Sequence, residues 1–486
     1  MRKQTRTRLA AVTFAVLILA SCGQKPGVEQ LSSGVSGFGV PGQSGAGGAV
    51  DENGQPIEGA TEDGAAADGA VGSNPGSTGS AGSGPGSTGS GTGATGAQKQ
   101  GGKSEQPKAS GDNVGDVITI GLHAPVTGAS PFPQNGFKRG AGVFADYINA
   151  KGGINGRKVR IIFADDEFRP TKAKEVCSNM VEQKKVFLLV GGGGSDQIDQ
   201  CARYAASKGV PYLSAGVHET RPNQAPLNSL STFYALSLSY EQQIPMLSRI
   251  VTSQFKDKNV AVAVARNDSL NGFHAKSLAA MEKAGAEVVW GKGNERLPKE
   301  ADASVSAIAT TICNRMGPTG GVVLWNAAPV VLIQAAKSMP CTNNGLVKFI
   351  GPGNTNGLNV VAQNACNDID GAQFFSTAPQ LDKIGQVDPN FIPAYKKKNN
   401  GAAPDDIGIL LWGVEKLVGE MLKATGKDLS RKSFMAAANS GKTFQSGVFP
   451  PVSYGANKRL GGTAMHLLEA DCGSQQYKTK QMNVRP

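Results

Sequence analysis

The chain has 486 residues, with 49 Lys and Arg against 38 Asp and Glu, so its formal net charge is +11 at pH 7. The basic residues are scattered, and the one dense run, 396–398, precedes Asn399-Asn400-Gly401 and is typical of a solvated helix end. Because the basic residues form no stripe interleaved with aromatic residues, the positive charge does not indicate a nucleic-acid partner.

The first 21 residues predict a secretory signal peptide. Basic residues precede an apolar run, 9–19, that is too short for a stable membrane span. The run ends in Leu19-Ala20-Ser21-Cys22, which resembles the bacterial lipobox, so we expect Cys22 to carry lipid such as palmitate. The lipid bilayer is then a partner, and the protein is extracytoplasmic and anchored to the bacterial cell membrane. The alternative is an ordinary signal peptide followed by an incidental cysteine.

Residues 22–114 predict a disordered tether between Cys22 and a folded part. Gly, Ser, Ala and Thr dominate this segment, and it has too few large apolar residues to offset the entropy of ordering. Within it, GSNPGSTGSA at 72–81 is followed by the near copy GSGPGSTGSG at 82–91, whose glycine content disfavours a structured repeat. An O-glycosylated stalk is the alternative.

The folded part shows strands that alternate with helices. The first half has predicted strands at 117–122, 159–163, 186–190 and 210–214, and predicted helices at 136–150, 171–183 and 197–207. The pattern restarts with a strand at 259–265, a helix at 273–284 and a strand at 287–290. It continues at 301–314, 321–325, 329–338 and 347–350 and in a long helix at 407–425. This order predicts an α/β fold of two Rossmann-like lobes with parallel sheets and a ligand cleft between them.

Six cysteines follow Cys22, and an even number outside the cytoplasm favours disulfide bonds. No CxxC or His-rich spacing supports the rival reading, a metal site. The layout of the elements suggests three pairs: Cys177 with Cys201, Cys313 with Cys341, and Cys366 with Cys472.

The segment most informative about function is the glycine run 191–194, which follows a predicted strand and is followed by Ser195 and Asp196. Glycines let a ligand approach the backbone, and the start of a helix attracts an anion such as a carboxylate. Alternatively, Ser195 or Asp196 is only a helix N-cap. A dinucleotide-binding site is a third interpretation of the glycine run. It is disfavoured because the fingerprint would need its last glycine where Asp196 stands, and no P-loop lysine follows.

Three motifs resemble the leucine/isoleucine/valine-binding protein family, the type I periplasmic solute-binding proteins. They are the run 147–157 (YINAKGGINGR), the end of the next strand at 164–166 (ADD), and 209–214 (GVPYLS). The resemblance implies two lobes joined by a three-segment hinge near 234–240, 375–379 and 449–454. Lobe 1 would comprise 115–236 and 376–448, and lobe 2 would comprise 237–375 and 449–486. It also implies a small-molecule solute, an ABC permease as partner, and no cofactor.

The resemblance also places candidate ligand-binding residues. Ser195 falls where the family contacts the ligand carboxylate through a hydroxyl, and Gly216 and His218 fall where a backbone group and a Thr complete that anchor. On the other lobe, Leu270 stands where the family often has a Tyr, and Trp325 stands where an aromatic residue contacts the ligand. Trp325 is equally consistent with core at the end of a strand, and His218 with a partly exposed loop residue.

The ligand class is the main departure from the family. Amino-acid binders commonly place a Glu after Gly351-Pro352, where this chain has Gly353-Asn354. A buried ammonium without a carboxylate partner is costly, so an α-amino acid requires another acid, such as Asp268 or Glu219, to reach the site. The alternatives for the ligand are a branched-chain amino acid-like solute, an amide, or a carboxylate without the amine. The last class includes an aromatic acid that packs against Phe132 and Trp325. Asn354 is itself a candidate ligand contact.

An enzyme and a ligand-sensing receptor are the two other classes of function. An enzyme is disfavoured because the chain has no G-x-S-x-G or H-E-x-x-H motif, and the carboxylates at 165–167 usually cap or pair locally at a strand end. We therefore expect no catalysis. A ligand-sensing receptor without transport needs the same lobes, hinge and tether, so the sequence leaves it open.

Overall fold

The computed structural model describes residues 115–486, apart from 217, 220, 222, 343–344 and 354–355. The predicted signal peptide, Cys22, the tether and Asn354 therefore lie outside the described residues. Within the part of the chain that the structure describes, no helix combines the length and the apolar character needed to cross a membrane.

The first lobe is built on a parallel five-stranded sheet with the order β2-β1-β3-β4-β5. Its strands are β1 (Val117–Ala124), β2 (Lys158–Asp165), β3 (Leu188–Gly191), β4 (Tyr212–Ser214) and β5 (Phe233–Ala235). Strands β3, β4 and β5 are buried on both faces, which explains their continuous apolar sequences.

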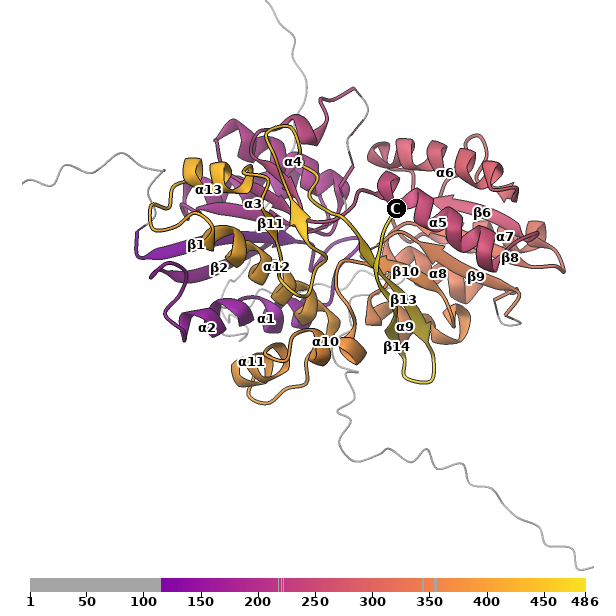
Figure 1. The fold of residues 1–486 in the computed structure, drawn as a ribbon. Coiled ribbons are helices and arrows are strands. Elements are labelled where there is room, and N and C mark those ends of the chain that lie inside the picture. The colour runs from indigo at the N-terminus through magenta and orange to yellow at the C-terminus, as the bar shows by residue number, and fades with distance from the viewer. Residues whose placement is uncertain (1–114, 217, 220, 222, 343–344, 354–355) are drawn as a thin grey trace, which may run out of the picture. The chain divides into compact units, whose positions relative to one another are not determined.

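Helices cover both faces of this sheet. They are α1 (Gln134–Gly140), α2 (Val143–Asn149), α3 (Pro170–Glu182), α4 (Ser195–Ser207), α10 (Leu381–Val387), α11 (Phe391–Lys398), α12 (Asp406–Lys423) and α13 (Arg431–Ala438), with a 3-10 turn η1 (Leu227–Ser229). Helices α3 and α4 lie on one face, and α1, α2 and α12 lie on the other (Figure 1).

The predicted helix at 136–150 is two helices in the structure. Gly142 adopts φ 77° between α1 and α2, a left-handed conformation that favours glycine. The buried carboxylate of Glu415 on α12 then accepts hydrogen bonds from the backbone N–H groups of Gly142 (2.6 Å) and Ala145 (3.2 Å). The break was not visible in the sequence because its partner lies far along the chain.

The second lobe is built on a seven-stranded sheet with the order β14-β13-β10-β9-β8-β6-β7. Its strands are β6 (Asn259–Val264), β7 (Glu287–Trp290), β8 (Gly321–Asn326), β9 (Val347–Gly351), β10 (Gln373–Ser376), β13 (Met465–Asp471) and β14 (Gln476–Val484). Its helices are α5 (Tyr240–Gln254), η2 (Asp268–Leu270), α6 (Asn271–Lys283), α7 (Ala303–Met316), α8 (Pro329–Ser338) and α9 (Asn359–Ile369). The sheet is parallel from β7 to β10, whereas β13 and β14 pair antiparallel at one edge, which the sequence prediction lacked.

The chain crosses between the two cores three times. The crossings follow β5, β10 and a small antiparallel pair formed by β11 (Thr443–Phe444) and β12 (Val452–Ser453). Tyr454 packs in the first core, where its hydroxyl donates to the carbonyl of Ala235 (3.0 Å). The third crossing therefore follows Tyr454, whereas the sequence-based boundary between the lobes was set at residue 449.

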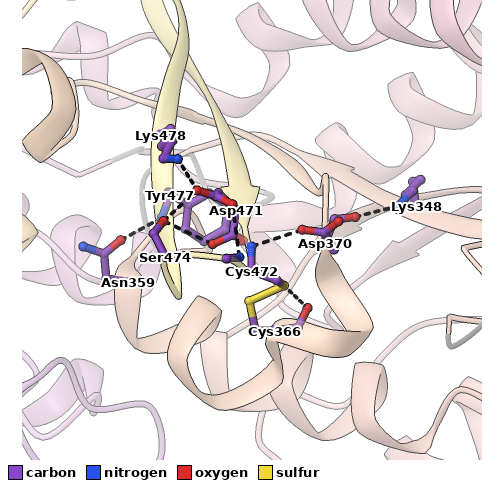
Figure 2. Close-up of a disulfide and its surroundings, with 10 residues drawn as sticks. Lys348, Asn359, Cys366, Asp370, Asp471, Cys472, Ser474, Tyr477 and Lys478 are labelled. Carbon is purple, nitrogen blue, oxygen red and sulfur yellow. Dashed lines mark hydrogen bonds and ion pairs between the residues drawn. A yellow bond between two sulfur atoms is a disulfide. The ribbon is translucent and has the colours of Figure 1, made fainter. Parts of the chain in front are cut away.

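The three predicted disulfide pairs are present in the structure: Cys177–Cys201, Cys313–Cys341 and Cys366–Cys472. The third joins α9 to the turn between β13 and β14 (Figure 2). Around it, Asp370 accepts a hydrogen bond from the backbone N–H of Cys472 (3.1 Å), and Asn359 accepts one from that of Tyr477 (2.9 Å). These contacts attach the C-terminal hairpin to the second lobe.

Candidate functional site

A cavity of about 330 Å³ is lined by residues of both lobes. The first lobe contributes the segments that follow β1, β2, β3 and β4, together with one side of α12. The second contributes the segments that follow β6, β7 and β8. The ligand sites of open α/β sheets lie at the carboxyl ends of their strands, so the cavity is where this fold predicts a site.

The glycine run forms one wall of the cavity, and Gly193 is the residue that the geometry requires. Gly193 has φ 91°, and a Cβ there would lie 2.6 Å from the ring of Phe132 and 2.5 Å from Pro125. Glycine therefore allows the Phe132 ring to pack against the backbone, and both residues line the cavity.

Helix α4 begins at this wall with Ser195, Asp196 and Gln197 in its first turn, all of which line the cavity. The N-cap residue, Gly194, has no side chain, and first-turn N–H groups have no partners within a helix. Together with the helix dipole, they favour an anion at this point. Asp196 is paired with Arg221, with 3.2 Å between its carboxylate and Nε of the arginine. Gly216 lines the cavity nearby.

A buried polar chain that the sequence did not predict supports this wall. His123 lines the cavity, its Nδ1 lies 2.8 Å from the carboxylate of Asp166, and its Nε2 lies 2.8 Å from the hydroxyl of Tyr212. All three side chains are buried. His123 also lies near Cys177 and Cys201, but those sulfurs form a disulfide and are not thiolates, so the group is no metal site.

Another part of the lining is apolar. Helix α12 presents Ile407, Leu410, Leu411 and Val414, a spacing that places them on one helical face along about 10 Å of the axis. The remaining apolar lining includes Phe137, Leu358 and Phe449. The cavity thus joins an anion-attracting end to a long apolar wall.

The second lobe lines the cavity with Asn267, Leu270, Asn326 and the segment 327–329. Trp325 is fully buried in the core and meets Phe349 edge-on, with 5.9 Å between ring centroids, and it is not among the lining residues. Successive side chains of a strand point to opposite faces, so Asn326, and not the predicted contact Trp325, reaches the cavity. Trp325 is core at the end of a strand.

His218 is also absent from the lining. It is 4% exposed and packs edge-on against Phe233, with 5.5 Å between ring centroids. Burial lowers its pKa to about 4, so the imidazole is neutral at pH 7. The structure therefore brings Phe132, Ser195, Gly216 and Leu270 together around the cavity and places His218 outside it.

The two acids considered as partners for an ammonium do not line the cavity. Glu219 accepts a hydrogen bond from the backbone N–H of Glu241 (3.0 Å) at the start of α5, and burial raises its pKa to about 8. Asp268 also lies outside the lining. Among the described lining residues, the acidic side chains are Asp196, which is ion-paired, and Glu300, which is exposed.

The carboxylates of Asp165 and Asp166 have hydrogen-bond partners at the end of β1, just beyond it and in their own turn. Asp166 holds His123, and Asp165 accepts hydrogen bonds from the backbone N–H groups of Val126 and Glu167, both at 2.9 Å. Of these contacts only the one from Glu167 is local, as expected from the sequence, whereas His123 and Val126 lie 43 and 39 residues away along the chain.

A family model described as periplasmic binding protein matches residues 117–476. The chain belongs to the periplasmic binding protein family. The resemblance to its leucine/isoleucine/valine-binding members is confirmed by the relatives found, and with it the two-lobed type I fold. Members of this family are solute-binding proteins.

Relatives agree with this assignment. An amino acid binding protein of Pseudomonas aeruginosa is 29% identical over 191 residues, which is 39% of this chain and 50% of that protein. The chain thus spans about half the length of this relative, and a second one from the same organism is matched over 52% of its length.

Two solved structures share the fold. A solute-binding protein of an ABC transporter from Rhodopseudomonas palustris in complex with 3,4-dihydroxybenzoic acid has a TM-score of 0.61 and 18% identity, covering 76% of this chain and 97% of that chain. The branched-chain amino acid-binding protein LivJ of Streptococcus pneumoniae in complex with isoleucine has a TM-score of 0.60 and 19% identity, covering 76% and 100%.

Proposed function

We propose that this protein captures a small apolar carboxylate that lacks a free amine, between two lobes that close over it, and delivers it to an ABC permease. The observation that carries the proposal is the composition of the cavity. The start of α4 and the apolar face of α12 both line the cavity, and the described lining offers no buried, unpaired acid for an ammonium.

The energetics of the cavity support this ligand class over an α-amino acid. A carboxylate at the start of α4 gains N–H hydrogen bonds, and each CH₂ group buried against the α12 wall contributes about 0.8 kcal/mol. An ammonium in the same chamber would lose its hydration without gaining a carboxylate partner. Proteins of this fold were solved with isoleucine and with 3,4-dihydroxybenzoic acid, so the fold itself allows either choice.

Because each lobe lines part of the cavity, a bound ligand favours closure of the two lobes. A ligand that contacts α4 on one lobe and the residues after β6 and β8 on the other stabilises the closed state over the open one. The three chain crossings act as the hinge for this movement. A lipid on Cys22 and the segment 22–114 would keep the clamp near the membrane that holds its permease.

A thermal-shift screen tests the ligand class. The protein from Cys22 onward is heated with apolar and aromatic carboxylates, α-amino acids, amides and sugars, because a ligand at 100 times its Kd adds about 2.7 kcal/mol of stability. Stabilisation by apolar carboxylates is expected. Stabilisation by α-amino acids alone would contradict the proposed ligand class. A separate uptake assay distinguishes transport from sensing, because cells that lack the protein should lose uptake of the solute only if the protein serves transport.

The anchor needs a separate test. We expect mass spectrometry of the cellular protein to find a chain that begins at Cys22 with acyl groups attached, and we expect Cys22→Ala to release the protein from the membrane fraction. A Cys22→Ala variant that stays membrane-bound would contradict lipid anchoring.

A further inference from the structure

Two asparagine side chains of the second lobe line the cavity at neighbouring strand ends. Asn326 is the last residue of β8, and Asn267 lies just beyond β6. The two strands are paired so that Val264 stands beside Asn326, and the backbone N–H of Ala265 donates to the carbonyl of Asn326 (2.9 Å). The strand pairing thus places both amides at the same edge of the sheet.

Both amides keep a buried polar atom without a hydrogen-bond partner. Asn326 is 5% exposed, and neither its Nδ2 nor the Oδ1 of Asn267 has a partner among the described residues. Buried polar groups in proteins are normally paired, and leaving one unpaired is costly. The loop is held by backbone hydrogen bonds and by the Arg296 guanidinium, which donates to the carbonyls of Val264 and Ala265. It therefore does not need the Oδ1 of Asn267 or the Nδ2 of Asn326.

The unpartnered atoms are complementary to a group that both donates and accepts a hydrogen bond. Asn267 offers an acceptor and Asn326 offers a donor, and a hydroxyl both donates and accepts one hydrogen bond. Rotating both amides exchanges the two roles, and the pair then still offers one donor and one acceptor. The pair carries no charge, so it gives a charged group no counter-ion.

We propose that Asn267 and Asn326 form a subsite for a hydroxyl group of the ligand, and that this protein selects hydroxylated apolar carboxylates over their unsubstituted parents. The inference rests on the proposed function, which places the carboxylate at the start of α4 on the other lobe. A ligand held at both ends contacts both lobes, so its hydroxyl favours the closed state as well as providing selectivity. A site built to bind a hydroxyl also discriminates strongly against an analogue that lacks it.

Calorimetry with matched probes tests the subsite. The protein from Cys22 onward is titrated with benzoate and with 3- and 4-hydroxybenzoate, and with hexanoate and 6-hydroxyhexanoate. We expect at least one hydroxylated probe to bind about tenfold or more tightly than its parent. Asn326→Leu, which is close in shape, should reduce that preference to less than about threefold while the affinity for the parent stays within about twofold.

Two further variants serve as a second test and as a control. Asn267→Leu tests the same subsite if Asn326→Leu does not fold, and Asn364→Leu on α9, outside the cavity lining, should leave the preference intact. If the unsubstituted carboxylates bind as tightly as the hydroxylated probes, the hydroxyl subsite is wrong and the carboxylate proposal stands. The same conclusion follows if the preference for hydroxylated probes survives in both Asn267→Leu and Asn326→Leu. Failure of every carboxylate to bind would overturn both.

Discussion

The hydroxyl of Tyr212 lies 2.8 Å from Nε2 of His123, and the pair occupies the space beside Gly191 that a side chain would need. A Cβ at residue 191 would stand 1.9 Å from the Tyr212 oxygen and 2.2 Å from the His123 nitrogen. The first glycine of the run is therefore required by a buried hydrogen bond that supports the site, while Gly193 is required by the approach of Phe132.

Gly191→Ala should destabilise the first lobe. The added methyl group forces Tyr212 and His123 apart, and overpacking plus a broken buried hydrogen bond costs roughly 2 to 4 kcal/mol. Urea unfolding measures the change. Gly385→Ala on α10 is the matched control, because its Cβ would meet Ile392 at an ordinary 3.7 Å, and equal stability of the two variants would refute the packing argument.

Ser195→Ala tests the anion end of the cavity. If the Ser195 hydroxyl binds the ligand carboxylate, its loss should weaken binding by about 1 to 3 kcal/mol, measured by calorimetry with the best apolar carboxylate. The affinity should remain partly intact because the backbone N–H groups of α4 are unchanged. An unchanged Kd removes Ser195 from the ligand contacts.

Glu219 predicts a pH dependence of stability. Burial raises the pKa of this carboxyl from 4.5 to about 8, so between these values the folded state binds more protons than the unfolded state. Its contribution to stability is then greatest at low pH and falls as the pH rises from 4.5 to about 8. Tyr240, Glu241 and Lys276 are the titratable neighbours that act on it.

The measurement is urea unfolding at about pH 5 and about pH 9 for the wild type and Glu219→Gln. The wild type should lose more stability across this range, by an amount on the order of a few kcal/mol. Glu415, whose pKa burial raises to about 7, changes stability in the same direction in both proteins and cancels in the comparison. Glu282→Gln on α6, a half-exposed position, should behave as the wild type. Parallel pH profiles for the wild type and Glu219→Gln would refute the assignment.

The disulfides predict a thiol count and an order of stabilities. Thiol titration of the denatured, unreduced protein should find almost no free thiol, and several free thiols would contradict the three bonds. Cys366–Cys472 closes a separation of 106 residues and Cys177–Cys201 one of 24, so in the chain-entropy model the longer loop stabilises more, by roughly 4 to 5 against about 3 kcal/mol. Replacing each pair with alanine and measuring urea unfolding tests this order.

The sequence predicted the parts of the fold that rest on local pattern. Buried strands such as β3 and the glycine-to-helix transition at Ser195 are continuous signals, and the order of elements was enough to suggest the three disulfides. Helix α5 was missed although Ser239 and Gln242 form a capping box at its start, a signal present in the sequence.

The parts that escaped prediction depend on distant partners or on register. The backbone N–H groups at the break near Gly142 find their acceptor in Glu415, far along the chain, and His123 is tied to Tyr212 across the sheet. Trp325 and Asn326 differ by one strand position, which exchanges the core face for the cavity face. The ligand contact was predicted at Trp325 because it is aromatic, whereas the neighbouring Asn326 lines the cavity.

The most direct test of the account compares leucine with 4-methylpentanoate, the same molecule without the α-amine. Calorimetric titration of the protein from Cys22 onward gives both dissociation constants under one set of conditions. We predict that 4-methylpentanoate binds more tightly, because the carboxylate and apolar chain are held while no buried, unpaired acid of the described lining receives an ammonium. Tighter binding of leucine would contradict the proposed ligand class.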